Sequence, residues 1–106
     1  MVEQKAIRRS RGRGYEVPRI AADVRKLERL SRLSTFRCGY LVVVGLGFSH
    51  DQFNDWIDAG DVSRRGAITS AVPLRSGGYA HVGVIIVPRP LVSSRPAPYA
   101  PPCKFR

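Results

Sequence analysis

Apolar residues recur with a helical period in the first third of the chain. Their spacings of three or four positions draw one apolar stripe along a helix. The stripe consists of Val17, Ile20, Val24, Leu27 and Leu30. A proline at position 18 suits the first turn of such a helix, because its missing N–H group would have no intrahelical partner there. The pattern predicts an amphipathic helix over residues 18–33.

A continuous apolar run follows this helix. Residues 38–45 read Cys-Gly-Tyr-Leu-Val-Val-Val-Gly, a β-branched segment between glycines. Such a run is typical of a strand that is buried on both faces at the centre of an α/β layer structure. We therefore expect a central strand here, covered on both sides.

The next segment carries the signals of a helix start. Ser49 and Gln52 form the Ser-x-x-Gln pattern of a capping box, and Phe48 and Phe53 are placed to form a hydrophobic staple. Gly60 is expected to end this helix as a left-handed cap. The sequence thus predicts a second helix over residues 49–59, with its aromatic side chains, Trp56 included, facing the core.

The last third is less regular. Residues 67–74 and 79–87 are candidate strands, separated by a Gly-Gly turn at 77–78. Six of the eight prolines lie between residue 88 and the end of the sequence, which indicates an extended, disordered, Pro-rich basic tail over 91–106. The expected fold class is α/β, a small mixed sheet with two packed helices, in a single domain over residues 1–90.

The charge is large and unevenly distributed. Eighteen basic and eight acidic residues give a net charge of +10. Residues 1–37 carry eleven of the basic residues and four acidic ones, whereas residues 48–62 carry four aspartates and no basic residue. This asymmetry favours a polyanionic partner, nucleic acid, with DNA expected before RNA. Simple solubility of a basic chain and an acidic protein partner are the alternative explanations of the same bias.

The basic residues fall into two groups. One lies in the Arg-Gly-rich segment 8–14, which has no apolar side chain and is expected to be a mobile loop. The other lies on the outer face of the predicted helix. The candidate nucleic-acid-binding residues are Arg8, Arg9, Arg11, Arg13, Arg19, Lys26 and Arg29. Tyr15 could stack on a base.

The chain begins with a Glu-x-Lys tripeptide. In a strand, Glu3 and Lys5 project from the same face. A carboxylate and an ammonium group so placed could hold a divalent metal ion and position an attacking water for phosphodiester hydrolysis. A solvated charge pair is the simpler explanation of this tripeptide.

The succession of elements resembles a known nuclease family. A Glu-x-Lys strand, a basic loop, an amphipathic helix and the Gly-Tyr-Leu-Val-Val-Val strand resemble the restriction-endonuclease-like PD-(D/E)xK family over about residues 1–45. The resemblance implies that Glu3 is a catalytic, metal-binding acid, that Lys5 is its catalytic partner and that the cofactor is Mg²⁺. The family has a further metal-binding aspartate on a preceding strand, which nothing here matches. The resemblance therefore implies the C-terminal part of such a fold, truncated or degenerate, with cleavage weak or absent.

Three functions from different classes remain open at this point, of which the third is a protein-interaction module that uses the predicted acidic helix over residues 49–59. The first is a nucleic-acid-binding protein similar to a degenerate metal-dependent nuclease. The second is a non-enzymatic basic binding or assembly protein, viral or ribosome-associated. His50 is expected to have a surface or capping role at the start of the second helix and His81 to be part of a strand, and neither cysteine is assigned any chemistry. No apolar run reaches the roughly 18 residues of a membrane span. We expect a cytoplasmic protein with no membrane partner that self-associates or has a partner subunit.

Overall fold

The computed structural model describes residues 1–33, 35–62, 64 and 66–89. The predicted tail over 91–106 lies outside the described residues. Within them the chain forms four strands, two α-helices and one short 3₁₀ turn. In chain order these are β1 (Val2–Arg8), η1 (Arg9–Arg11), α1 (Arg13–Leu30), β2 (Cys38–Leu46), α2 (His50–Gly60), β3 (Ala67–Pro73) and β4 (Tyr79–Pro88).

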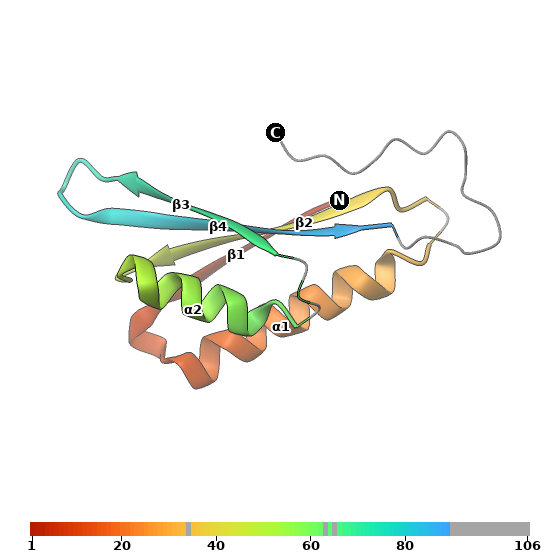
Figure 1. Cartoon of the computed structure of the whole chain (residues 1–106), viewed down its shortest axis with the longest axis horizontal. Helices are drawn as coiled ribbons and strands as arrows, with labels where there is room; N and C mark the ends of the chain where they lie inside the picture. The colour runs from red at the N-terminus through yellow and green to blue at the C-terminus, as the bar shows by residue number, and fades with distance from the viewer. Residues whose placement is uncertain (34, 63, 65, 90–106) are drawn as a thin grey trace.

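The strands form one mixed sheet in the order β1-β2-β4-β3. β1 runs parallel to β2, whereas β4 pairs antiparallel with both β2 and β3. Both helices lie against the same face of the sheet (Figure 1). This arrangement confirms the expected α/β class with two helices packed on a small mixed sheet.

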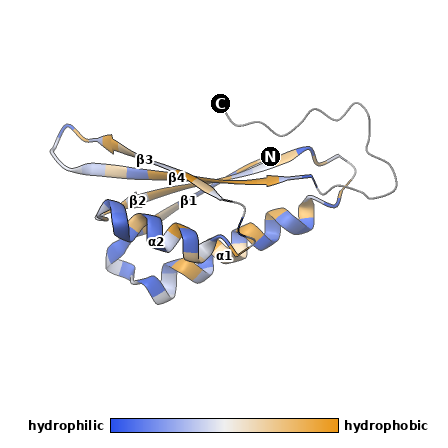
Figure 2. Ribbon diagram, in the orientation of Figure 1, coloured by the Kyte–Doolittle hydropathy of each residue, from blue (hydrophilic) through white to orange (hydrophobic). Residues whose placement is uncertain are grey.

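The core lies between the two helices and the sheet. Alternate residues of β2 and β4 point toward the helices and are buried, as the two-residue period of a strand requires. The helices present apolar stripes to this layer and polar faces to the outside (Figure 2). The fully buried side chains include Ile7, Ile20, Val24, Leu27, Leu41, Val43, Phe53, Ile57, Ile85 and Val87.

The first helix begins earlier than the sequence predicts. It starts at Arg13 instead of residue 18, and it ends at Leu30. The expected mobile loop over residues 8–14 is therefore wrong for most of its length, since Arg9–Arg11 form a 3₁₀ turn and the helix follows at once. Gly12 makes this junction possible, because its φ of 88° is accessible to glycine at little cost. Pro18 lies inside the helix and removes one intrahelical hydrogen bond.

The second helix confirms the predicted start. The Gln52 N–H donates to Ser49 Oγ at 3.3 Å, and the Ser49 N–H donates to Gln52 Oε1 at 3.4 Å, which completes the capping box. The rings of Phe48 and Phe53 meet edge to face at 5.6 Å. Trp56 is buried as expected, against Phe48.

The explanation of Gly60 as a left-handed cap is wrong. Gly60 is the last residue of α2, and its φ is not positive. It is buried, and a Cβ atom there would lie 2.4 Å from Ile20 Cγ2. Gly60 is therefore needed for the close approach of α1 and α2.

The central strand is covered by helices on one face only. β2 lies between β1 and β4, as expected, but no described helix packs on the face that carries Tyr40, Val42 and Val44 (Figure 1). The predicted β3 and β4 are confirmed within one residue, with Gly77 and Gly78 at positive φ in the turn. No helix in the described residues is long and apolar enough to cross a membrane.

Candidate nucleic-acid interface

The Glu-x-Lys residues lie on the face of β1 that meets α1. Glu3 Oε1 accepts a hydrogen bond from Lys26 Nζ at 2.9 Å. Lys5 Nζ lies 2.9 Å from Asp23 Oδ2. Asp23 and Lys26 are three residues apart on α1 and so share one face of the helix. The structure thus brings Glu3 and Lys5 together, as expected, and places each in an ion pair with the helix.

These four side chains form an alternating cluster of two carboxylates and two ammonium groups. The hydrogen bond to Glu3 raises the pKa of Lys26, with a smaller contribution from Asp23. The apolar stripe of the helix does not reveal that Asp23 pairs with Lys5. This ion pair forms because the Lys5 side chain reaches from β1 across to α1. No group of three His, Cys, Asp or Glu side chains that could hold a metal ion occurs in the described ranges. In the structure, the two ion pairs of this cluster link β1 to α1.

A buried acid that the sequence analysis did not single out fixes the arginine-rich segment. Glu16 is fully buried near the start of α1. The backbone N–H of Arg8 donates to Glu16 Oε2 at 2.7 Å, and the Arg19 guanidinium donates to Glu16 Oε1. The hydrogen bond to Glu16 raises the pKa of Arg19. Glu16 therefore ties the end of β1 to the first turns of α1. Its only signal in the sequence is that it is the one acid among the arginines of residues 8–19.

The segment that Glu16 fixes is the arginine turn, defined as residues 8–15. The side chains of Arg8, Arg9 and Arg11 are exposed, and within the described residues none of them forms an ion pair. Arg13 is also exposed, but its Nε lies 3.1 Å from Asp55 Oδ2 of α2. The turn therefore presents at least three guanidinium groups that are not neutralised by a described acid.

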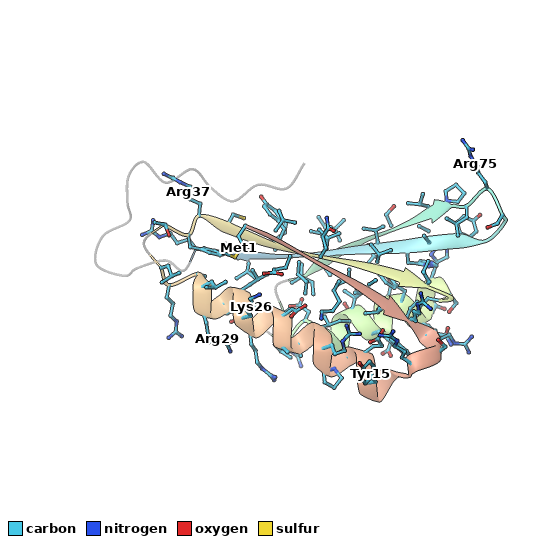
Figure 3. The ribbon with its side chains drawn as sticks, turned by 180° about the vertical axis from the view of Figure 1, so that it is seen from behind. Met1, Tyr15, Lys26, Arg29, Arg37 and Arg75 are labelled. Atoms are coloured by element: carbon cyan, nitrogen blue, oxygen red, sulfur yellow. The ribbon has the colours of Figure 1, made fainter. Side chains whose placement is uncertain are left out.

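An exposed aromatic ring ends the arginine turn. Tyr15 is 54% exposed at the beginning of α1, and Figure 3 shows it at the end of the helix that is nearest the turn. The guanidinium carbons of Arg11 and Arg19 lie 6.0 and 5.3 Å from the ring centroid. This spacing is within the range of cation–π attraction. The cluster combines positive charge with an accessible π face.

The remaining candidates lie along α1. Arg29 is exposed and points away from the sheet, as Figure 3 shows. Lys26 is exposed but paired with Glu3, and Arg19 is half-buried and paired with Glu16. Of the seven predicted nucleic-acid-binding residues, Arg13, Arg19 and Lys26 thus have ion-pair partners. Among these seven candidates, the charges without a described ion-pair partner are three arginines of the turn and Arg29.

A separate polar pocket contains both histidines. His81 Nε2 and His50 Nδ1 are 3.1 Å apart, in a pocket of about 170 Å³ between α2 and the β3–β4 pair. His81 is buried, and its Nδ1 has no hydrogen-bond partner within the described part of the chain. Burial lowers the pKa of His81, and the neighbouring His50 lowers it further. The expected surface or capping role of His50 thus includes a contact with His81 that their 31-residue separation did not reveal.

Comparisons with protein-family models, curated proteins and solved structures find no match to this chain.

Proposed function

We propose that this protein binds nucleic acid through phosphate contacts made by the arginine turn and the outer face of α1. The observation that carries the proposal is the set of exposed guanidinium groups of Arg8, Arg9 and Arg11, which meet no described acid. The buried Glu16 holds the backbone that carries them. A fixed backbone lowers the conformational entropy lost on binding.

The chemistry of these side chains fits a phosphodiester backbone. A guanidinium group offers several N–H donors in one plane and can bind two phosphate oxygens at once. Contacts of this kind position a protein on nucleic acid but carry no sequence information. Tyr15 adds a ring face on which an unpaired base could stack. Binding should therefore be salt-dependent and nearly indifferent to sequence.

DNA is the proposed ligand in preference to RNA, because the chain order of strand, basic turn, helix and strand resembles that of DNA-cleaving enzymes. We place this activity in the cytoplasm. A non-enzymatic protein that binds RNA through the same turn, in a viral or ribosomal assembly, would show the opposite preference.

The test is equilibrium binding to fluorescent DNA duplex, single-stranded DNA and RNA of equal length. The variant is Arg8→Ala/Arg9→Ala/Arg11→Ala. The matched control is Arg37→Ala/Arg64→Ala/Arg75→Ala, which removes three exposed charges outside the turn. Figure 3 shows Arg37 and Arg75 at opposite ends of the sheet.

We expect the turn variant to lose at least tenfold in affinity on unrelated DNA sequences and the control to lose much less. Equal losses in the two triple variants would contradict a localised interface. Tighter binding to RNA than to either form of DNA would favour the ribosomal or viral alternative.

A second candidate function, metal-dependent phosphodiester hydrolysis, is favoured by the charge cluster on β1. Glu3 and Lys5 share one face of the strand, and a second carboxylate, Asp23, lies within 2.9 Å of Lys5. Magnesium is commonly held by one or two carboxylates together with water and substrate phosphates. In this proposal Glu3 binds Mg²⁺, and Lys5 orients the attacking water. The proposal requires that Glu3 leaves its ion pair with Lys26 in order to bind the Mg²⁺ ion.

Plasmid nicking with Mg²⁺ tests this candidate. Glu3→Ala and Lys26→Ala break the same ion pair, but only Glu3→Ala removes a proposed catalytic group. A nuclease would lose cleavage in Glu3→Ala and Lys5→Ala and keep it in Lys26→Ala. Binding without cleavage in the parent protein would favour the non-enzymatic function.

A further inference from the structure

The sheet has a second face on which no described helix packs. Residues of each strand alternate between the two faces, and those that point away from α1 and α2 form what we call the open face. On the central strands β2 and β4 this face is made of apolar side chains. Val42 and Val44 belong to it on β2, and Val82 and Val84 on β4.

Strand pairing joins these side chains into one continuous patch. Val42 pairs with Val84 and Val44 with Val82 across β2 and β4. Ile68 of β3 pairs with Val84 from the other side, so the patch extends over three strands. Paired side chains on one face lie within contact distance of each other.

Polar residues of the open face lie on the edge strands. Gln4 and Arg8 belong to β1, and Ser70 belongs to β3. None of the open-face residues of β2 or β4 is charged. An apolar centre with a polar rim is the usual anatomy of a protein–protein interface.

We propose that the open face packs against the open face of a second copy of this chain, related by a two-fold axis. A two-fold interface needs a surface that is complementary to itself, and an uncharged apolar centre meets that condition. The chain carries a net charge of +10, so most surface contacts between two copies would be repulsive. The centre of the open face avoids this repulsion, because η1 and the outer face of α1 lie on the helix side of the sheet and only Arg8 of the arginine turn reaches the rim of the open face (Figure 1).

The area of the open face suits a dimer. Four strands about 4.8 Å apart and about seven paired residues long, at roughly 3.3 Å per residue, make a flat area of about 440 Å² per copy. Two such faces give about 900 Å², just below the roughly 1,000 Å² expected of a specific interface, before the added area from the relief of the side chains is counted. The exposed side chains are those of the edge strand β3, where Ile68 is 51% and Val72 is 47% exposed, whereas Val84 at the centre of the patch is only 7% exposed. Two sheets packed face to face would form a four-layer dimer with the helices outside.

Self-association would also compensate for the small hydrophobic core of this domain. Fewer than 90 described residues bury a small core between the helices and one face of the sheet. Packing the second face would remove an apolar surface that monomeric proteins rarely leave exposed. This inference does not rest on nucleic-acid binding, because the two surfaces share only Arg8, at the rim of the open face, and no variant in the test below changes Arg8.

The test is sedimentation velocity of the full chain over about 1 to 100 µM, a range in which interfaces of modest area dissociate. The variants are Ile68→Lys and Val44→Lys on the open face. The matched control is Leu33→Lys, because Leu33 is 53% exposed, like Ile68, but lies outside the sheet. Circular dichroism melting shows whether each variant is folded.

We expect the wild type and Leu33→Lys to sediment at twice the 11.8 kDa chain mass and Ile68→Lys to dissociate at least tenfold more readily. If Val44→Lys fails to fold, Ile68→Lys decides alone. A monomeric wild type at the highest concentration overturns the proposal, whatever else covers the face. A dimer that survives Ile68→Lys, or that Leu33→Lys also disrupts, overturns the assignment to the open face.

Discussion

Replacing the partly exposed Arg19 should destabilise the protein more than replacing the buried Glu16 to which it is bonded. Glu16 is fully buried, whereas the Arg19 side chain is 33% exposed. In Arg19→Ala the carboxylate stays buried, with the Arg8 N–H as its remaining described donor. Leaving a buried charge without its ionic partner costs about 3 to 5 kcal/mol. In Glu16→Ala the freed guanidinium can turn into water, and the main loss is an acceptor for the Arg8 N–H, about 1 to 3 kcal/mol.

Urea denaturation of the two single variants and of the double variant measures this difference. For a domain of this size 1 kcal/mol shifts the melting temperature by roughly 4 to 8 °C, so Arg19→Ala should melt more than 10 °C below the parent. The double variant should be more stable than Arg19→Ala, because it removes the stranded carboxylate. Arg25→Ala, an exposed arginine of the same helix, is the control and should cost little. If Arg19→Ala stays within about 0.5 kcal/mol of the parent, the buried ion pair does not hold the turn as described.

Three further predictions concern the packing of the core and the histidine pair. Gly60→Ala should destabilise the protein by about 1 to 3 kcal/mol in urea denaturation, because the added methyl group would overlap Ile20; an unchanged midpoint would show that α1 and α2 can move apart freely. Leu27→Asp should abolish the cooperative thermal transition, because it places an unpaired charge in the core; a transition at the parental temperature would contradict the stripe assignment. Burial and the neighbouring His50 lower the pKa of His81 in the folded protein. Below the ordinary histidine pKa of about 6.5, His81 therefore binds a proton more readily in the unfolded chain than in the folded one. Stability should therefore fall as the pH drops below about 6.5, and His81→Leu should weaken this decline; an equally steep decline in the variant would assign it to other groups.

Local patterns were sufficient to predict most of the fold. The apolar stripe, the β-branched run and the Ser-x-x-Gln box each act through neighbours in sequence, and the structure has a helix, a strand and a capped helix at these places. The start of α1 could not be predicted in this way. It depends on Glu16 reaching back to the Arg8 N–H, a contact that exists only once β1 lies beside the helix.

The parts of the candidate site that sequence did not reveal are also contacts between distant elements. The spacing of Glu3 and Lys5 correctly placed them on one face of β1, but Lys26 and Asp23 become their partners only through strand–helix packing. A glycine at the end of a predicted helix is typical of a helix cap. Only the close approach of Ile20 in the structure shows why position 60 needs a residue without a side chain. The β-branched run predicted a central strand, yet burial of both its faces depends on what covers the sheet, which the run does not encode.

The salt dependence of DNA binding tests the central claim most directly. Between about 50 and 200 mM salt, the logarithm of the binding constant should fall linearly with the logarithm of salt concentration, with a slope of about 0.9 for each phosphate contacted. Arg8→Ala/Arg9→Ala/Arg11→Ala should reduce the magnitude of that slope by about three, one for each lost contact. The charge-matched Arg37→Ala/Arg64→Ala/Arg75→Ala should leave the slope near that of the parent. A slope that is the same in all three proteins, or binding that ignores salt, would contradict phosphate recognition by the arginine turn.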